Sequence, residues 1–263
     1  MILIVGNILK DVYLSLDSRT ETFETDKNGT KWLDLSFDAK DHHYFCRNSV
    51  FNGAAVSLEV FQNFGIEAKI NTSDFTLDET MPRTLTSEYR YILTAGDDVS
   101  YLVPTTPTNT KFEEPKEAPD YIYIDRSAHL TKQTAQQIAL YLLSHPNTKL
   151  ILYLKDASDP IYTELVDLAQ LIFTENSSAN LNSDKTIFIS ENNLNYKNLT
   201  EHISTPRIDK LTHLSAHSTS AATIISSFLL GKTVEESLKL ARLNVENSSL
   251  DSTLSLHELN ALR

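Results

Sequence analysis

Residues 121–154 read YIYIDRSAHLTKQTAQQIALYLLSHPNTKLILYL. The stretch begins with one short apolar run, 121–124, and ends with another, 150–154. Between them Thr131 begins a helical pattern that Pro146 stops, with apolar side chains at Ala135, Ile138, Ala139 and Leu142. A helix between two such runs predicts two parallel strands of one sheet, because the helix returns the chain to the edge from which it started.

The same alternation continues on both sides of this stretch. Upstream, residues 2–5 form an apolar run that Gly6 ends, and after Gly53 apolar residues recur every four positions. Downstream, the pattern predicts strands at 171–173 and 186–189, and helices at 218–230, 234–247 and around 256–262. We therefore expect a three-layer α/β fold, in which helices cover both faces of a mostly parallel sheet.

One region departs from this pattern. Residues 12–50 alternate apolar and polar side chains around Asn28-Gly29, a strong hairpin turn, and a second hairpin is predicted at Ala95-Gly96-Asp97-Asp98. We expect residues 12–50 and about 86–103 to form a β-ribbon that belongs to a single domain, 1–263, but lies outside its layers. His42 and His43 are neighbours on this ribbon and point to opposite faces, so no metal site is expected there.

Composition excludes several classes of protein. The net charge of −12 disfavours binding to nucleic acid, no apolar run is long enough for a membrane span, and a single cysteine excludes a disulfide framework. We expect a cytoplasmic protein with no nucleic-acid or membrane partner. The chain has only six glycines, where average usage gives about eighteen, so a glycine-rich phosphate cradle has few residues to draw on.

Four segments, in order along the chain, resemble the ribokinase or PfkB family of carbohydrate and nucleoside kinases. Residues 6–11, GNILKD, look like the family's first strand with its substrate-binding residues, here Asn7 and Asp11. Residues 51–56, FNGAAV, resemble the glycine hinge before the first helix, with Asn52 in place of one glycine and Gly53 retained. Residues 231–241 resemble the C-terminal helix pair. The ribbon stands where the family has a lid, through which its members commonly dimerise.

This resemblance implies transfer of a phosphoryl group from Mg·ATP to a hydroxyl, yet three catalytic segments differ. The family's base is an aspartate in a Gly-Ala-Gly-Asp turn, and its position falls on Ser218, in Ser215-Ala216-His217-Ser218. The magnesium-side Asn-x-x-Glu falls on residues 176–179, where Asn176 remains and Ala179 replaces the glutamate. The glycine-bearing turn at the nucleotide reads Ser190-Glu191-Asn192-Asn193 and has lost its glycines. Serine cannot act as a general base near neutral pH.

Several of these residues have two possible interpretations. Asp11 binds a ligand hydroxyl or caps a turn, and Gly53 is a hinge or only a backbone requirement. His217 is a replacement base, or a cap or surface residue, and Ser218 is most simply an N-cap. Asp125 ends a strand and is either a displaced catalytic carboxylate or a surface ion pair with Arg126; Asp156 and Asp159, after the next strand, carry the same ambiguity.

These observations leave three functions open. The first is a degenerate kinase, or pseudokinase, that binds a small sugar-like or nucleoside-like ligand or a partner. The second is an active carbohydrate kinase that uses Mg·ATP and a non-standard base, with Asp125, Asp156 and His217 as candidates. The third is a purely structural dimer that pairs through the ribbon.

Overall fold

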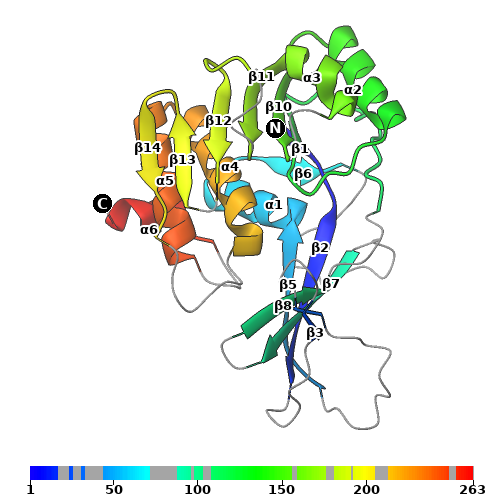
Figure 1. The fold of residues 1–263 in the computed structure, drawn as a ribbon. Helices are drawn as coiled ribbons and strands as arrows, with labels where there is room; N and C mark the ends of the chain where they lie inside the picture. Colours follow the sequence, from blue (N-terminus) through cyan, green and yellow to red (C-terminus); the bar gives the residue numbers. More distant parts are fainter. Residues whose placement is uncertain are drawn as a thin grey trace.

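The computed structural model describes residues 1–16, 24–25, 31–32, 44–71, 88–95, 98–102, 108–155, 159–175, 181–190, 192–204, 213–248 and 253–262. Its main body is an eight-stranded central sheet with the order β14-β13-β12-β11-β10-β9-β1-β6 (Figure 1). The parallel strands are β1 (Ile2–Val5), β6 (Ala68–Ile70), β9 (Tyr121–Ile124), β10 (Lys149–Leu154), β11 (Ala169–Thr174) and β12 (Thr186–Ile189). The predicted mostly parallel α/β fold is thereby confirmed.

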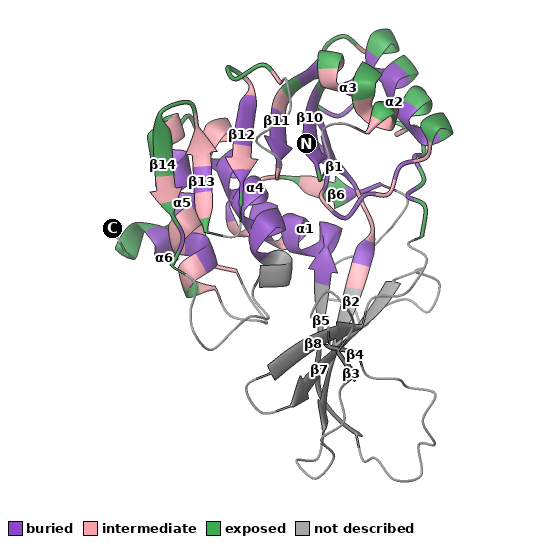
Figure 2. Ribbon diagram, in the orientation of Figure 1, coloured by how far each residue is buried: buried purple, intermediate pink, exposed green. Residues whose placement is uncertain are grey.

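Helices cover both faces of the central sheet. One face packs against α1 (Ala54–Asn63), α4 (His213–Leu229), α5 (Val234–Asn247) and α6 (Leu256–Ala261), and the other against α2 (Lys132–Ser144) and α3 (Thr163–Leu168), which follows the 3₁₀ turn η1 (Pro160–Tyr162). The strand β1 shows the division, because Ile2 and Ile4 join the first cluster while Leu3 and Val5 join the second. A strand buried on both faces explains why the run at residues 2–5 is continuously apolar. In Figure 2 the inner strands β1 and β10 and the helices α1 and α4 are mostly buried, whereas α2 exposes its outer side.

A second, smaller sheet projects from this body, and we call it the small sheet (Figure 1). It has the order β5-β2-β7-β8 and consists of β2 (Ile8–Leu16), β5 (Tyr44–Gly53), β7 (Glu88–Ala95) and β8 (Asp98–Leu102). The hairpin predicted around residue 96 is present as the antiparallel pair β7–β8. The short strands β3 (Glu24–Thr25) and β4 (Lys31–Trp32) pair with each other, while Asn28, Gly29, His42 and His43 lie outside the described residues.

The helix boundaries follow the predicted capping residues at two places. The Thr131 side chain accepts a hydrogen bond from the Thr134 backbone N–H at 3.1 Å and caps α2. Thr233 and Glu236 form the expected capping box at the start of α5. No helix in the described part of the chain has the length and apolar character that a membrane crossing requires.

Two features differ from the sequence-based expectation. The helix predicted to begin at Ser218 begins at His213, because residues 213–217 contain neither glycine nor proline and nothing in them stops a helix. The strands β13 (Asn193–Tyr196) and β14 (Leu199–His202) were not predicted, and they form an antiparallel edge on the sheet. Polar residues dominate both strands, so their periodicity is weak.

Candidate functional site

The chain leaves the central sheet for the small sheet at Gly6 and Asn7, and it returns at Asn52 and Gly53. We call these four residues the junction. The two crossings touch, since Ala54 N–H donates to the Asn7 carbonyl at 3.1 Å and Ile8 pairs with Gly53. Gly53 has a φ of +67°, and a Cβ placed on it would lie 2.5 Å from the Asn7 carbonyl oxygen. Only glycine fits this position without moving backbone.

The side chains of Asn7 and Asn52 are engaged within the junction or next to it. Asn7 Nδ2 donates to the Thr108 carbonyl at 2.7 Å, and Asn7 Oδ1 accepts from Thr110 Oγ1 at 2.8 Å. Asn52 is buried, and its Oδ1 accepts from the Gly53 backbone N–H at 2.7 Å. The bonds of Asn7 fix the first crossing against the segment before β9, and the bond of Asn52 lies within the second crossing. They leave direct ligand binding by Asn7 and Asn52 as a prediction.

Asp125 lies directly after β9 and packs against Gly6 of the junction. Its Oδ2 accepts from Ser57 Oγ at 2.6 Å, and its Oδ1 accepts from both the backbone N–H and the Oγ of Ser127, at 2.8 and 2.6 Å. The residue is 1% exposed. The alternative of a surface ion pair with Arg126 was wrong, because Asp125 is buried among hydroxyl donors and Arg126 turns to another carboxylate. A Cβ on Gly6 would meet Asp125 and Ser127 at under 3 Å, so this packing also requires a glycine.

Four polar side chains meet beside the junction, and we call them the charged cluster: Arg126, Tyr153, Glu175 and His217. They come from the ends of three neighbouring strands, β9, β10 and β11, and from α4. Arg126 Nε donates to Glu175 Oε1 at 2.6 Å and Arg126 Nη2 approaches Oε2 at 3.4 Å, which makes the pair bidentate. Glu175 Oε1 also lies 3.5 Å from His217 Nδ1. The Tyr153 hydroxyl lies 2.8 Å from the same ring nitrogen.

The electrostatics of the charged cluster favour an ionised carboxylate. Burial alone would raise the pKa of the Glu175 carboxyl, but its interactions with His217 and Arg126 outweigh that effect and lower the pKa to about 2. Burial, together with the charge of Glu175, raises the pKa of the Tyr153 hydroxyl well above its ordinary value. Tyr153 is therefore a neutral hydroxyl and Glu175 an anion at physiological pH.

His217 and Ser218 lie inside α4 and not at its beginning. Both interpretations of them as cap or surface residues were wrong, because the helix starts at His213 and the two residues are 9% and 2% exposed. An α-helix leaves only its first four backbone N–H groups without an internal partner. The N–H groups of His217 and Ser218 come after those four, so they are committed to the helix.

The other residues predicted for the site lie outside the junction and the charged cluster. Asp11 lies in β2, where it pairs with Val50 of β5 and Arg90 of β7. Ser190 follows β12, and its Oγ accepts from the Asn193 N–H at 3.1 Å in a tight turn. Asn176 and Asp156 lie outside the described residues, and Asp159 caps η1 by accepting from the Ile161 N–H. Their predicted roles stay predictions.

Sequence reasoning missed Tyr153 and Glu175. The signal for Glu175 was present, since it directly follows the apolar run 171–173 and Thr174, and the ends of parallel strands meet at one edge of the sheet. Tyr153 sits within an apolar run and carries no such signal. Among the described residues, no three histidine, cysteine or acidic side chains lie close enough to hold a metal ion.

Comparison with known proteins gave structural matches only. No protein-family model matches the sequence, and no curated protein matches it. The structure of Arabidopsis thaliana ribokinase complexed with ribose and ATP is 11% identical, with a TM-score of 0.61 over 99% of this chain and 97% of that one. A nucleoside kinase from Methanocaldococcus jannaschii is 12% identical, with a TM-score of 0.63 over 99% and 97%. Ribokinase from Cryptococcus neoformans in complex with ADP is 9% identical, with a TM-score of 0.63 over 100% and 99%.

These three matches are likenesses of the overall fold. They extend over nearly the full length of both chains, so they concern the whole arrangement and no single motif. The chain has the ribokinase-like fold, the α/β fold of carbohydrate and nucleoside kinases.

Proposed function

We propose that this protein binds a small sugar-like or nucleoside-like ligand where the small sheet meets the central sheet, with little or no ATP-dependent phosphoryl transfer. The observation that carries the proposal is the course of α4. In the kinases that the sequence resembles, a glycine turn before this helix frees backbone N–H groups for a phosphate and supplies the base. Here the helix continues through that position without glycine or aspartate.

The chemistry at Ser218 supports the absence of phosphoryl transfer. Its backbone N–H lies beyond the first turn of α4, so it is not available as an anion donor. Its side chain is a hydroxyl that is 2% exposed, and a hydroxyl does not accept a proton near neutral pH. Losing a positioned base typically lowers a rate by about 10² to 10⁴.

Asp125 is a weak substitute for that base. Both of its carboxylate oxygens already accept hydrogen bonds from Ser57 and Ser127, and the residue is almost fully buried. A general base has to reach the hydroxyl that it deprotonates at about 2.6–3.2 Å. The contacts of Asp125 instead support a role in holding α1 and β9 together.

The ligand side of the proposal rests on the junction. Gly53 keeps the backbone conformation that the crossing requires, and Asn7, just before β2, keeps its spacing from Asp11 within that strand. The structural neighbours include a ribokinase in complex with ribose and a nucleoside kinase, which supports a small polar molecule as the ligand. Asp11 is the residue that we expect to accept from a ligand hydroxyl.

A thermal-shift titration tests this proposal. We expect ribose, or a nucleoside such as adenosine, to raise the Tm saturably, and Mg·ATP and Mg·ADP to leave it unchanged at millimolar concentration. A ligand at a hundred times its Kd stabilises a protein by about 2.7 kcal/mol, which is several degrees for a chain of this size. Asp11→Asn is expected to remove the shift, while Asp98→Asn, a matched change in β8 of the same sheet, keeps it.

Two results would contradict the proposal. A saturable shift with Mg·ATP together with sugar-dependent release of ADP would establish the active kinase. A flat response to all sugars and nucleosides, with no effect of Asp11→Asn beyond stability, would favour the purely structural reading. Pairing of two copies through the small sheet stays a prediction. The molar mass from light scattering after size-exclusion chromatography tests it directly.

One observation favours the active kinase as a second candidate. His217 has a carboxylate oxygen of Glu175 3.5 Å from its Nδ1, and a base oriented by a carboxylate is a common catalytic arrangement. In that case His217 Nε2 takes the proton of the ligand hydroxyl. His217→Gln would then abolish the release of ADP while leaving ligand binding intact.

A further inference from the structure

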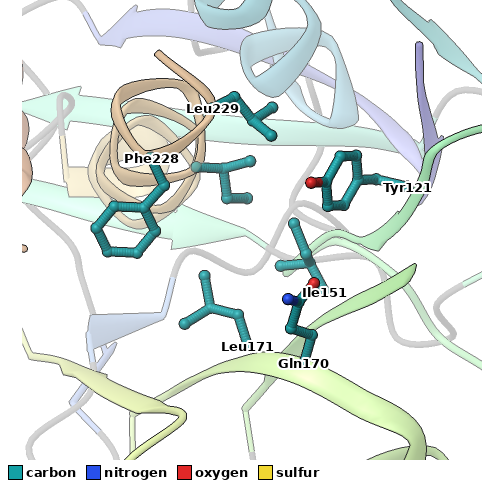
Figure 3. A pocket seen from close by; sticks show the side chains of 7 residues that line it. Tyr121, Ile151, Gln170, Leu171, Phe228 and Leu229 are labelled. Atoms are coloured by element: carbon teal, nitrogen blue, oxygen red, sulfur yellow. The ribbon is translucent and has the colours of Figure 1, made fainter. Parts of the chain in front are cut away.

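A cavity of about 330 Å³ lies at the edge of the central sheet opposite to the junction. Its floor is formed by the first halves of three neighbouring strands, with Tyr121 from β9, Ile151 from β10 and Gln170 from β11. Its roof is the C-terminal part of α4, which contributes Ile225, Phe228 and Leu229 (Figure 3). Asp125 and Glu175 follow the other ends of β9 and β11, so this cavity is separate from the proposed ligand site.

The size of the cavity selects the size of its occupant. An apolar cavity of about 150 Å³ holds one benzene ring, and small-molecule sites begin at about 300 Å³. The cavity beneath α4 is roughly twice as large as the benzene-sized one. The cavity is partly open to solvent, and its volume suits two fused rings better than a single ring.

The residues that line the cavity favour an apolar, planar ligand. Ile151 and Ile225 are 4% and 1% exposed and present aliphatic surfaces, and the Phe228 side chain faces the same space (Figure 3). An apolar ring that displaces water from such walls gains roughly 25 cal/mol for each Å² of surface removed from water. Branched sugars and nucleotides gain little here, because their hydroxyl and phosphate groups would lose hydrogen bonds to water.

Tyr121 and Gln170 are the polar residues of the lining, and they determine where a bound molecule can place an oxygen atom. The Tyr121 hydroxyl points into the cavity, and the amide of Gln170, an exposed residue, lies next to the Ile151 side chain (Figure 3). Within the described part of the chain, neither side chain has a hydrogen-bonding partner. The ammonium group of Lys149 lies 5.7 Å from the centre of the Tyr121 ring and adds a positive charge on this side. That charge favours an oxygen that accepts hydrogen bonds over a group that only donates them.

From the volume, the apolar walls and these two donors, we propose that the cavity binds a bicyclic aromatic molecule with one acceptor oxygen. The rings lie between Ile151 and Phe228, and the oxygen accepts from the Tyr121 hydroxyl and the Gln170 amide. The site differs from the proposed sugar or nucleoside site in position and in the chemistry that it selects. It does not depend on that function.

Titration of the full chain with coumarin tests the proposal, because coumarin is a neutral bicyclic aromatic with a carbonyl oxygen. We expect saturable binding by calorimetry. Leu229→Trp, which fills the cavity from α4, should weaken it at least tenfold. Leu230→Trp adds the same side chain at the next position, which is 44% exposed and does not line the cavity, and should leave binding unchanged. Tyr121→Phe should weaken binding about two- to tenfold by removing one hydrogen bond.

Two outcomes would overturn the proposal. One is the absence of saturable binding to the unchanged protein at millimolar coumarin. The other is equal binding to the protein with Leu229→Trp, which would assign coumarin to a different surface. If circular dichroism shows that Leu229→Trp does not fold, Leu171→Trp fills the same cavity from the half-buried start of β11 and decides the question in its place.

Discussion

The junction and the charged cluster lie at the same edge of the central sheet, yet they are built in opposite ways. The junction is a matter of shape, since Gly6 and Gly53 stand where a Cβ would strike backbone or buried side chains. The charged cluster contains no glycine and is a matter of charge, with Arg126 held against Glu175 and His217 beside them. The small sheet is thus attached through closely packed backbone, whereas the residues next to α4 are held together by an ion pair.

The largest effect is expected from Gly53→Ala. The backbone angles of Gly53, φ +67° and ψ −131°, lie outside the left-handed helical region and cost an L-residue about 1–3 kcal/mol. The overlap with the Asn7 carbonyl adds about 1–3 kcal/mol because backbone must move. The free energy of unfolding, from urea denaturation, should therefore fall by about 2–6 kcal/mol. Gly65→Ala is the control, because Gly65 has a φ of +70° and open space around the position of a Cβ. This substitution should lower the free energy of unfolding only by the cost of placing an L-residue at a positive φ. If both substitutions lowered the free energy of unfolding equally, close packing around Gly53 would not be what distinguishes the junction.

A smaller loss is expected from Asp125→Asn. The amide offers one acceptor oxygen where the carboxylate has two, so one of the donors on Ser57 and Ser127 faces an NH₂ group. A buried donor left without a partner costs about 1–3 kcal/mol, and unfolding in urea measures it. Asp159→Asn removes charge from a carboxylate that caps η1 through one bond and should cost less. A loss at Asp159 as large as at Asp125 would contradict the structural role given to Asp125.

The smallest of the three losses, about 1 kcal/mol at pH 7, is expected from Glu175→Gln, because the carboxylate is partly exposed and screened by water. The pKa of Glu175 is lowered in the folded state, so its contribution is full above pH about 4.5 and is lost as the pH falls towards 2. The difference in unfolding free energy between the two proteins should therefore shrink between pH 4.5 and 2. Glu235→Gln, in an exposed pair with Lys239, should show little effect at any pH. A difference that is independent of pH would refute the ionic account of the cluster.

The two regions also differ in how well the sequence predicts them. Local rules were sufficient for the strands β1, β9 and β10, for the caps at Thr131 and Thr233, and for the importance of Gly53. The charged cluster joins residues up to 91 positions apart, Arg126 and His217, and only the parallel arrangement of the strands brings them together. No local pattern encodes such a contact. The start of α4 was mispredicted for a related reason, since a family turn was expected where this chain simply continues its helix.

The continuity of α4 has a mechanical consequence. From His217 at the charged cluster to Leu229 over the cavity the helix rises about 18 Å, with no glycine or proline to bend it. This one continuous helix therefore contacts both the charged cluster and the cavity. A ligand in the cavity that shifted α4 along its axis would also shift His217, and by thermodynamic linkage such a coupling would act by the same factor in both directions.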